Sequence, residues 1–561
     1  MATVGSFSKS SVGEFFGALA GESWQEKVIN FPPDVFGVAA SVLARTGAYL
    51  AVVSHWPPKN LKKPRWEDHV STIAKKWRAE WQFGGSKPPA YVQKLWHAIT
   101  EDAAISLSEL FKINYSKVAD PRQHKARRLT RNLLEILAIS DETCSGVGIP
   151  SNKGKFSTAL EEWAGFKLWA QLIYASPATL CDNIDPIHFS VLPKLHTPQT
   201  GITVRSLSHN LALCHASEVR IRWGWGSSPN VEDRRHGLNI LLLPWPDTIR
   251  PADFSSCTPR WGDLPGMKET GHGFFCYDVR GGRPWDARRF EEILERASSH
   301  VGTIDAVVMP ELAVRQREVD KIARHLLSIR PRPPILITGV SVPHGGGTIR
   351  NISVTLVPFQ KSKGRGKFEY VRFDQAKHHR WRLDSRQISQ YGLGGVLDPS
   401  CFWWENSYVP RRDLIFIAIN PWLTLCTLLC EDLARPDPIA DIVRAVGPNL
   451  IVSLLMDGPQ LAKRWPARYG TVLADDPGSS VLTITNLAMA ELSRARGQPS
   501  SRVIALWKDA QCGEPIEISL PSGKEAIVIC ATRERCLEYA ADGRSDNQAA
   551  ARLNLSGVHA V

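Results

Sequence analysis

The chain has 561 residues and a formal net charge of +12, with 43% hydrophobic and 22% charged residues. Its length predicts roughly two to four folding units, and its balance of residues excludes a collagenous or largely disordered protein. The basic excess is spread along the chain, so it permits an anionic partner such as nucleic acid without requiring one.

Eleven cysteines are scattered without a repeated spacing, and no CxxC pair is present. This pattern argues against a disulfide framework and a structural zinc site, so we expect reduced thiols. The first nine residues lack the basic-then-apolar order of a signal peptide. The longest apolar runs, 35–56 and 415–430, are broken by Arg45 and by Asn420-Pro421. We therefore expect a cytoplasmic protein without a membrane partner.

The first part of the chain carries a helical pattern. Apolar residues recur at helical spacing in residues 35–53, 91–111 and 129–139, which predicts a mainly α-helical domain over residues 1–175. Residues 176–236 are rich in Ser, Pro, Asn and His, and predict a connector or an irregular extension.

From residue 237 onwards, strand-like and helix-like segments alternate. Helical spacing marks residues 288–297, 319–328 and 439–446. Short apolar runs that suit strands occupy residues 238–244, 304–309, 335–340, 352–357, 414–419, 423–429, 450–455, 481–485, 503–507, 516–520 and 526–531. The alternation predicts a layered α/β domain over residues 237–540. The polar, Ala-rich residues 541–561 predict a flexible tail.

Three chemically reactive residues each follow a strand-like run: Glu311, Lys377 and Cys430. Strand ends are where α/β sheets place ligands, and a strand-to-turn elbow exposes a nucleophile. Taken singly, each residue also has an ordinary interpretation, as a helix cap, part of a solvated basic run, or a small core residue. The adjacent His378 and His379 point in different directions, so no metal site is predicted.

Taken together, these residues resemble the nitrilase, or carbon–nitrogen hydrolase, superfamily over residues 237–540. That family shows Pro-Glu after a strand, Lys followed by His, and a Cys that opens a Cys-Glu-Asp elbow, in this order. The separations here are 66 and 53 positions. The second is long for the family, and an insertion around residues 394–412 accounts for the excess. The resemblance implies a four-layer α-β-β-α sandwich that forms a homo-oligomer.

The resemblance also implies a mechanism. Glu311 acts as general base, and Cys430 attacks an amide or nitrile carbon to form a thioester or thioimidate. Lys377 and the backbone N–H of Glu431 stabilise the tetrahedral anion. A thiol needs such activation at neutral pH, but the chemistry needs no metal or organic cofactor.

One part of the family pattern is missing. Many members carry a second glutamate a short way after the lysine, where this chain reads Leu383-Asp384-Ser385-Arg386-Gln387. Either Asp384 or Gln387 substitutes for it, or the role is lost.

A narrower resemblance concerns residues 429–438, 464–469 and 475–481. These segments are similar to nitrilase domains associated with bacterial defence reverse transcriptases. The similarity implies antiviral defence, with a polymerase or nucleic acid supplied as a partner from outside this chain.

The N-terminal region contains Lys75-Lys76-Trp77-Arg78, and similar basic-aromatic stretches lie at residues 59–66 and 122–131. Interleaved Trp and Lys/Arg can stack bases and bind phosphates. The alternative is an amphipathic helix with its tryptophans towards the core and its basic residues towards water.

Three classes of function therefore stay open. The first is a hydrolase of a small amide or nitrile. The second is a catalytically reduced scaffold that oligomerises and presents the N-terminal domain to a protein or nucleic acid. The third is a nucleic-acid-binding module with a vestigial hydrolase domain, whose affinity would fall steeply with salt.

Overall fold

The structure is a computed structural model. It describes residues 9–53, 63–82, 85–113, 121–149, 158–194, 202–226, 237–258, 269–278, 285–329, 332–345, 347–360, 368–409, 411–493, 501–547 and 550–561. The chain folds into two compact units. The first comprises residues 1–217, 441–447 and 535–551, and the second comprises residues 218–440, 448–534 and 552–561.

The first unit is built around α9 (Pro121–Thr143), against which α4 (Pro32–Thr46), α6 (Lys63–Glu80) and α7 (Ala90–Glu101) pack. The buried side chains of α9 include Leu129, Leu133 and Ile136, which share one helical face. The predicted helical character of this region is confirmed. The other elements of the unit are α2 (Val12–Ala20), α3 (Trp24–Lys27), η1 (Val28–Asn30), α5 (Ala48–Val53), β1 (Trp81–Gln82), β2 (Gly85–Ser86), α8 (Leu107–Phe111), α10 (Ala159–Ile173), β3 (Phe189–Pro193), η2 (Val204–Leu207) and β4 (Leu211–His215).

A segment near the C-terminus completes the first unit. Arg544 is buried and bonds Asp141 at 3.2 Å and Asp542 at 2.8 Å. It also donates to the carbonyl oxygen of Leu207 at 3.0 Å. The expected flexible tail is thus corrected: its first part is fixed by a buried arginine, and its end forms strand β23 (Ala550–Ala560).

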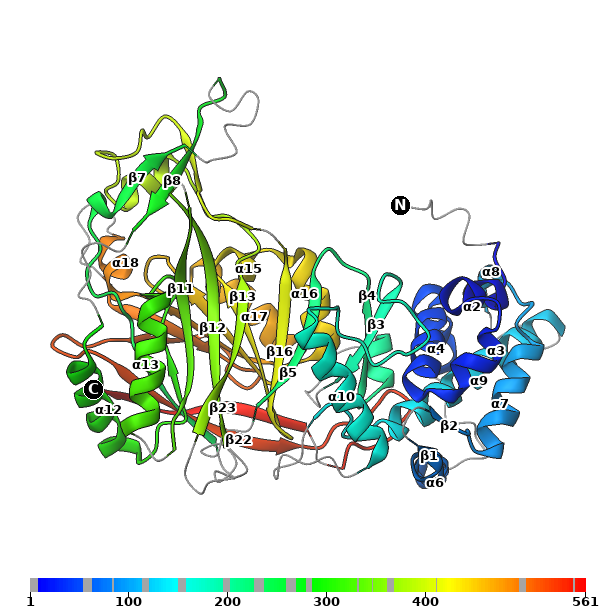
Figure 1. The fold of residues 1–561 in the computed structure, drawn as a ribbon. Helices are drawn as coiled ribbons and strands as arrows, with labels where there is room; N and C mark the ends of the chain where they lie inside the picture. Colours follow the sequence, from blue (N-terminus) through cyan, green and yellow to red (C-terminus); the bar gives the residue numbers. More distant parts are fainter. Residues whose placement is uncertain are drawn as a thin grey trace. The chain divides into compact units, whose positions relative to one another are not determined.

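The second unit contains two large sheets (Figure 1). In the first, the strands run in the order β13-β12-β11-β9-β6-β22-β23, and β10 pairs with β11. In the second, the order is β21-β20-β19-β18-β17-β16-β5. Strands of the first sheet are β6 (Gly237–Leu242), β9 (Ala306–Val308), β10 (Val314–Arg315), β11 (Ile335–Gly345), β12 (Thr348–Gln360), β13 (Phe368–Ala376) and β22 (Ile527–Cys536). Strands of the second are β5 (Arg220–Trp225), β16 (Asp413–Asn420), β17 (Leu423–Leu429), β18 (Leu450–Leu455), β19 (Ser480–Thr485), β20 (Val503–Lys508) and β21 (Ile516–Ser519).

The two sheets face each other and are joined by polar contacts as well as apolar packing. Gln375 on β13 donates to the carbonyl oxygen of Thr427 on β17 at 2.7 Å and accepts from the N–H of Ile415 on β16 at 2.9 Å. Ser353 on β12 bonds the Thr427 hydroxyl at 3.0 Å. These bonds fix β17 against β13, the two strands that end at Cys430 and Lys377.

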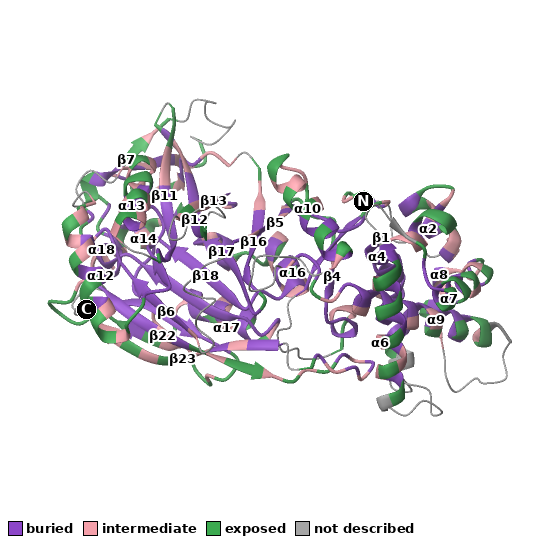
Figure 2. Ribbon diagram, turned by 60° about the horizontal axis from the view of Figure 1, so that its bottom comes forward, coloured by how far each residue is buried: buried purple, intermediate pink, exposed green. Residues whose placement is uncertain are grey.

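Helices cover the outer faces of both sheets. On the first sheet lie α12 (Ala287–Val301) and α13 (Gln316–Ile329), whose apolar faces, including Phe290, Ile293 and Ile322, are fully buried. On the second lies α17 (Trp465–Asp475), which packs on β19 and β20. In Figure 2 the strands are mostly buried and the helices expose one side. The predicted α-β-β-α sandwich is confirmed. The remaining helices of this unit are α14 (Ser385–Gln390), α15 (Glu431–Ala434), α18 (Leu487–Leu492) and η3 (Pro251–Asp253). Helix α16 (Pro436–Val446) is divided, with residues 436–440 in this unit and residues 441–446 in the first.

The segment expected to be a connector is more regular than the sequence indicated. It contributes β3 and β4, an antiparallel pair, and β5, which pairs in parallel with β16 at the edge of the second sheet. Since its polar composition masked these strands, local propensity alone did not reveal them.

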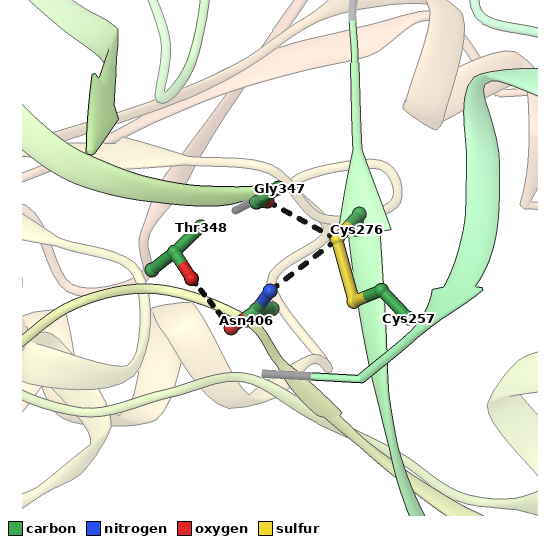
Figure 3. The surroundings of a disulfide bond; sticks show 5 residues. All are labelled: Cys257, Cys276, Gly347, Thr348 and Asn406. Atoms are coloured by element: carbon green, nitrogen blue, oxygen red, sulfur yellow. Dashed lines mark hydrogen bonds between the residues drawn. A yellow bond between two sulfur atoms is a disulfide. The ribbon is translucent and has the colours of Figure 1, made fainter. Parts of the chain in front are cut away.

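A third, four-stranded sheet has the order β14-β15-β8-β7. It consists of β7 (Phe254–Cys257), β8 (His272–Tyr277), β14 (Arg382–Leu383) and β15 (Phe402–Glu405). A disulfide joins Cys257 on β7 to Cys276 on β8, with 6.0 Å between the Cα atoms (Figure 3). The expectation that all thiols are reduced is therefore corrected. The antiparallel pairing of β7 with β8, which the spacing of the cysteines in the sequence does not indicate, brings Cys257 and Cys276 together.

Within the described residues, no helix combines the length and apolar character needed to cross a bilayer.

The buried Arg544 cluster predicts a large effect on stability. Replacing Arg544 by Met should lower the free energy of unfolding by about 3–5 kcal/mol, because the buried Asp141 and Asp542 lose the arginine that neutralises them. The matched control Arg535→Met, at an exposed site, should change it by less than about 0.5 kcal/mol. Urea unfolding measures both, and equal effects would contradict the proposed role of the cluster.

Candidate active site

Three strand ends bring the predicted catalytic residues into one region. Glu311 lies just beyond β9, Lys377 directly follows β13, and Cys430 directly follows β17. Their relative exposures are 1%, 2% and 3%. Such burial is unusual for a carboxylate and an ammonium group unless they are paired.

The centre of the site is a buried cluster of charges. The Lys377 ammonium nitrogen lies 2.8 Å from Glu311 Oε1 and 2.7 Å from Glu405 Oε2. Asn351 Nδ2 donates to Glu311 Oε1 at 2.7 Å and to Glu405 Oε1 at 2.9 Å. The backbone N–H of Trp381 donates to Glu405 Oε2 at 3.0 Å. The lysine and asparagine therefore hold both glutamates in fixed positions.

Sequence reasoning missed Glu405. The expected substitutes, Asp384 and Gln387, instead form the capping box of α14, where Asp384 Oδ1 accepts from the Gln387 N–H at 2.8 Å. Glu405 reaches the cluster because β15 pairs in parallel with β8, with Glu405 opposite Phe275. Glu405 belongs to residues 394–412, the stretch interpreted as an insertion. Its buried position at the end of β15 identifies it as part of the site.

Burial and charge set the protonation states. Burial raises the pKa of Glu311, Lys377 lowers it and Glu405 raises it, leaving it above the ordinary glutamate value. Burial lowers the pKa of Lys377, but Glu311, Glu405 and Cys430 raise it, and the result lies well above the ordinary lysine value. Burial and Glu311 raise the pKa of Cys430 well above that of a free thiol, against the opposing effect of Lys377. The resting site thus pairs an ammonium group with a neutral thiol.

One carboxylate oxygen in the cluster remains available. Glu311 Oε1 accepts from Lys377 and Asn351, whereas the buried Oε2 has no hydrogen-bond partner among the described residues. A buried acceptor without a donor is costly. Oε2 is therefore a suitable acceptor for a proton during a reaction.

Cys430 lies on a strained elbow between β17 and α15. Its backbone angles are φ 45° and ψ −106°, a region that non-glycine residues rarely adopt. The fully buried side chain of Asp432 accepts from the backbone N–H groups of His378 and His379 at 3.0–3.1 Å. It also bonds His379 Nδ1 at 3.0 Å. Asp432 thereby ties the segment after Cys430 to the segment after Lys377.

The predicted second oxyanion donor, the Glu431 N–H, has no acceptor among the described residues, as expected for the first residue of a helix. The Glu431 side chain lies 3.3 Å from Arg435 in an ion pair. Of Glu431, the backbone N–H is therefore the candidate oxyanion donor, and the side chain is not.

Gly339 on β11 fixes the position of Glu311. A Cβ atom on Gly339 would lie 2.4 Å from Glu311 Cα and 2.5 Å from both Leu312 N and Pro310 O. The Gly339 N–H donates to the Pro310 carbonyl oxygen at 3.0 Å. Leu312 has a positive φ of 52°, so the backbone that carries Glu311 is tightly turned against β11.

The cluster faces a small cavity of about 10 Å³, which is roughly the space of one water molecule. Glu311, Lys377 and Glu405 form its charged wall, while most of the other lining residues are apolar. These other residues are Phe275, Cys276, Tyr277, Leu312, Gly347, Ile349, Trp381, Asn406 and Met456. Nothing larger than a water molecule fits unless a wall moves.

The predicted basic-aromatic surface, Lys75-Lys76-Trp77-Arg78, does not present an aromatic ring on which a nucleic-acid base could stack. Trp77 is fully buried, and Arg78 donates to the carbonyl oxygens of Thr143 and Ser145 at 2.7 and 2.9 Å. Lys75 and Lys76 are exposed on α6. Trp77 therefore offers no face to a base, and the amphipathic-helix interpretation fits this segment. Of the neighbouring stretch, residues 59–62 lie outside the described residues.

Among the described residues, no group of three or more His, Cys, Asp or Glu side chains is arranged to hold a metal ion.

No protein-family model matches the sequence, and no curated protein matches it. Among solved structures, an amidase from Nesterenkonia sp. is 13% identical and covers 53% of this chain and 91% of its own, with a TM-score of 0.30. Nit3 of Saccharomyces cerevisiae, a member of branch 10 of the nitrilase superfamily, is 12% identical and covers 53% and 90%, with a TM-score of 0.31. A double mutant of the Nesterenkonia amidase, in complex with acrylamide, is 12% identical and covers 52% and 90%, with a TM-score of 0.30. Overlaps this weak carry no inference about activity.

The contact at Gly339 predicts that Gly339→Ala displaces Glu311. The rate at which iodoacetamide alkylates Cys430 should fall at least about tenfold, because the proton acceptor moves. The matched control is Gly395→Ala, where an added Cβ meets no atom within 4 Å. Peptide mass spectrometry measures both rates. Similar rates in both variants would show that the position of Glu311 does not depend on Gly339.

The cluster also predicts a pH shift. Because Glu405 raises the pKa of Glu311, Glu405→Gln should lower it. The acid limb of the pH profile of Cys430 alkylation should then move to lower pH, since Glu311 is ionised at lower pH. The control is Asp384→Ala. It should destabilise α14 by about 1 kcal/mol through loss of the cap, without changing the pH of the acid limb. An unmoved limb in Glu405→Gln would contradict the assigned coupling.

Proposed function

We propose that this protein is a hydrolase of the nitrilase type, which cleaves a non-peptide C–N bond in a small amide or nitrile. The observation that carries the proposal is the buried Glu311–Lys377–Glu405 cluster, with an unpartnered glutamate oxygen, beside the strained elbow of Cys430. Backbone strain at a thiol and perturbed pKa values in a buried cluster of charges are typical of reactive sites.

In the first half-reaction, Glu311 Oε2 accepts the proton of the Cys430 thiol as the sulfur attacks the carbonyl or nitrile carbon. Negative charge develops on the substrate oxygen or nitrogen. Lys377 and the Glu431 N–H stabilise that charge, and each such donor typically contributes about 3–4 kcal/mol. For an amide, Glu311 then returns the proton to the leaving nitrogen, so ammonia or an amine departs and a thioester remains. For a nitrile, the proton passes to the substrate nitrogen and gives a thioimidate, to which one water adds so that ammonia departs and the same thioester remains.

In the second half-reaction, Glu311 removes a proton from water, which attacks the thioester carbon. The carboxylic acid leaves, and the proton returns to the sulfur of Cys430. Glu405 does not contact the reacting sulfur in this scheme. It holds Lys377 and, through its negative charge, raises the basicity of Glu311.

The cavity supports a substrate that is small and uncharged. Its volume of about 10 Å³ leaves little room, and two carboxylates share a single ammonium group. An anionic substrate would add a further negative charge to this cluster, which is costly where solvent is excluded.

The setting of this activity is a separate part of the proposal. The narrower resemblance supports a role in bacterial antiviral defence, and the family resemblance supports a homo-oligomer. The alternative function, a scaffold that presents the N-terminal unit to a partner, is supported by the near closure of the cavity.

The direct test is a panel of small primary amides and nitriles, with ammonia release as the measurement. Wild type, assayed after reduction by dithiothreitol that is then removed, should release ammonia and accumulate a protein adduct with the mass of the acyl group at Cys430. Cys430→Ala should abolish both, because the nucleophile is absent. Cys426→Ala is the matched control, because Cys426 is a buried thiol on β17, the strand that Cys430 directly follows, and it should keep the activity.

The pH profile gives the acid–base assignment. In the wild type, kcat/KM should rise with pH through the raised pKa of Glu311, above the ordinary glutamate value of about 4.3. Glu311→Gln should remove this limb together with most of the rate. Ammonia release that survives Cys430→Ala, or a wild-type limb at the ordinary glutamate value, would count against the mechanism.

A further inference from the structure

The disulfide lies next to the catalytic cavity. Cys276 lines that cavity together with Glu311, Lys377 and Glu405, and its neighbours Phe275 and Tyr277 line it too. Both cysteines of the pair are half-buried, so a dissolved reductant can reach them. A bond in the wall of an active site can influence what enters it.

The strand that carries Cys276 is bonded directly to the strand that carries Glu405. The Asn406 N–H donates to the Phe275 carbonyl oxygen at 2.8 Å, and Asn406 Nδ2 donates to Cys276 Sγ at 3.4 Å. Figure 3 shows Asn406 between the disulfide and Thr348, whose hydroxyl donates to Asn406 Oδ1 at 3.3 Å. The residue after Glu405 therefore contacts the disulfide itself.

The surroundings accommodate a reduced Cys276 as well. Cys276 Sγ lies 3.2 Å from the carbonyl oxygen of Gly347 (Figure 3). A thiol at this position can donate its S–H to that oxygen, which the sulfur of a disulfide cannot do. Reduction thus replaces the covalent bond of Cys276 by a hydrogen bond, so the thiol of Cys276 is paired.

The disulfide holds an edge strand. β7 is the outermost strand of its four-stranded sheet and pairs only with β8 within that sheet. With the bridge closed, the wall leaves a cavity of about 10 Å³, which is too small for a primary amide. Releasing β7 from its covalent tie loosens its only partner in this sheet, β8, whose Phe275, Cys276 and Tyr277 line the cavity.

We propose that Cys257 and Cys276 form a thiol–disulfide site that controls access to Cys430: the disulfide form is closed, and the dithiol form admits substrate. The reaction partner is a dithiol reductant. Its two sulfurs become a disulfide, its two protons pass to Cys257 and Cys276, and the bridge is cleaved. This inference rests on the proposed function, because it describes regulation of the same site.

The test measures the alkylation rate of Cys430 by iodoacetamide in the full chain, with and without prior treatment by dithiothreitol that is then removed. Reduction should raise the rate about tenfold or more, because the alkylating agent reacts only with the open fraction. Cys257→Ser should be fast without reduction. The matched control is Cys536→Ser, because Cys536 is a half-buried cysteine outside the pair; this variant should behave as wild type. The alkylation rate of Cys512 in the same sample serves as the internal standard.

The outcomes separate the two proposals. A Cys430 that reacts rapidly and equally in the oxidised and reduced protein overturns the redox control and leaves the hydrolase proposal intact. Alkylation of Cys257 and Cys276 before any reduction also overturns the redox control alone, because the two thiols would then be free from the start. A Cys430 that stays slower than Cys512 in both states and in Cys257→Ser overturns the hydrolase proposal, and the redox control with it.

Discussion

The ion cluster formed by Glu311, Lys377 and Glu405 is the constraint on which the rest of the site depends. Two carboxylates and one ammonium group are removed from water, which is costly unless every charge keeps close partners. Lys377 lies within 2.8 Å of both carboxylates, and Asn351 bonds both. The cluster therefore tolerates little displacement, and the segments that carry its members must meet at one place.

The fold meets this requirement by ending strands from different sheets at the same location. β9 and β13 of one sheet deliver Glu311 and Lys377, β17 of the other delivers Cys430, and β15 of the small sheet delivers Glu405. Gln375 fixes the facing sheets against each other, and Asp432 joins the segments beyond their strand ends. Packing and hydrogen bonding thus turn four separate strand ends into one rigid site.

Local patterns in the sequence were sufficient to predict three of the four residues of the site. Glu311, Lys377 and Cys430 each follow an apolar run, so their positions at strand ends were predictable. Glu405 was not, because its place depends on the pairing of β15 with β8, which is more than a hundred residues earlier in the chain. The Cys257–Cys276 bridge and strand β23 likewise depend on long-range pairing, which composition and spacing do not reveal. In the N-terminal unit, Trp77 is buried, Arg78 bonds backbone carbonyl oxygens, and Lys75 and Lys76 are exposed. Local composition could not show that packing withdraws the tryptophan from the surface.

The central claim, that Glu311 and Lys377 act on a group bound to Cys430, is tested most directly by a crystal structure. Reduced and desalted protein would be alkylated with iodoacetamide, which leaves an acetamide group on the Cys430 sulfur. The account predicts that the amide of this group lies within hydrogen-bond distance of Glu311 Oε2, and its oxygen within that of Lys377 or the Glu431 N–H. An acetamide group directed away from these residues, or an unmodified Cys430 beside other alkylated cysteines, would contradict the account.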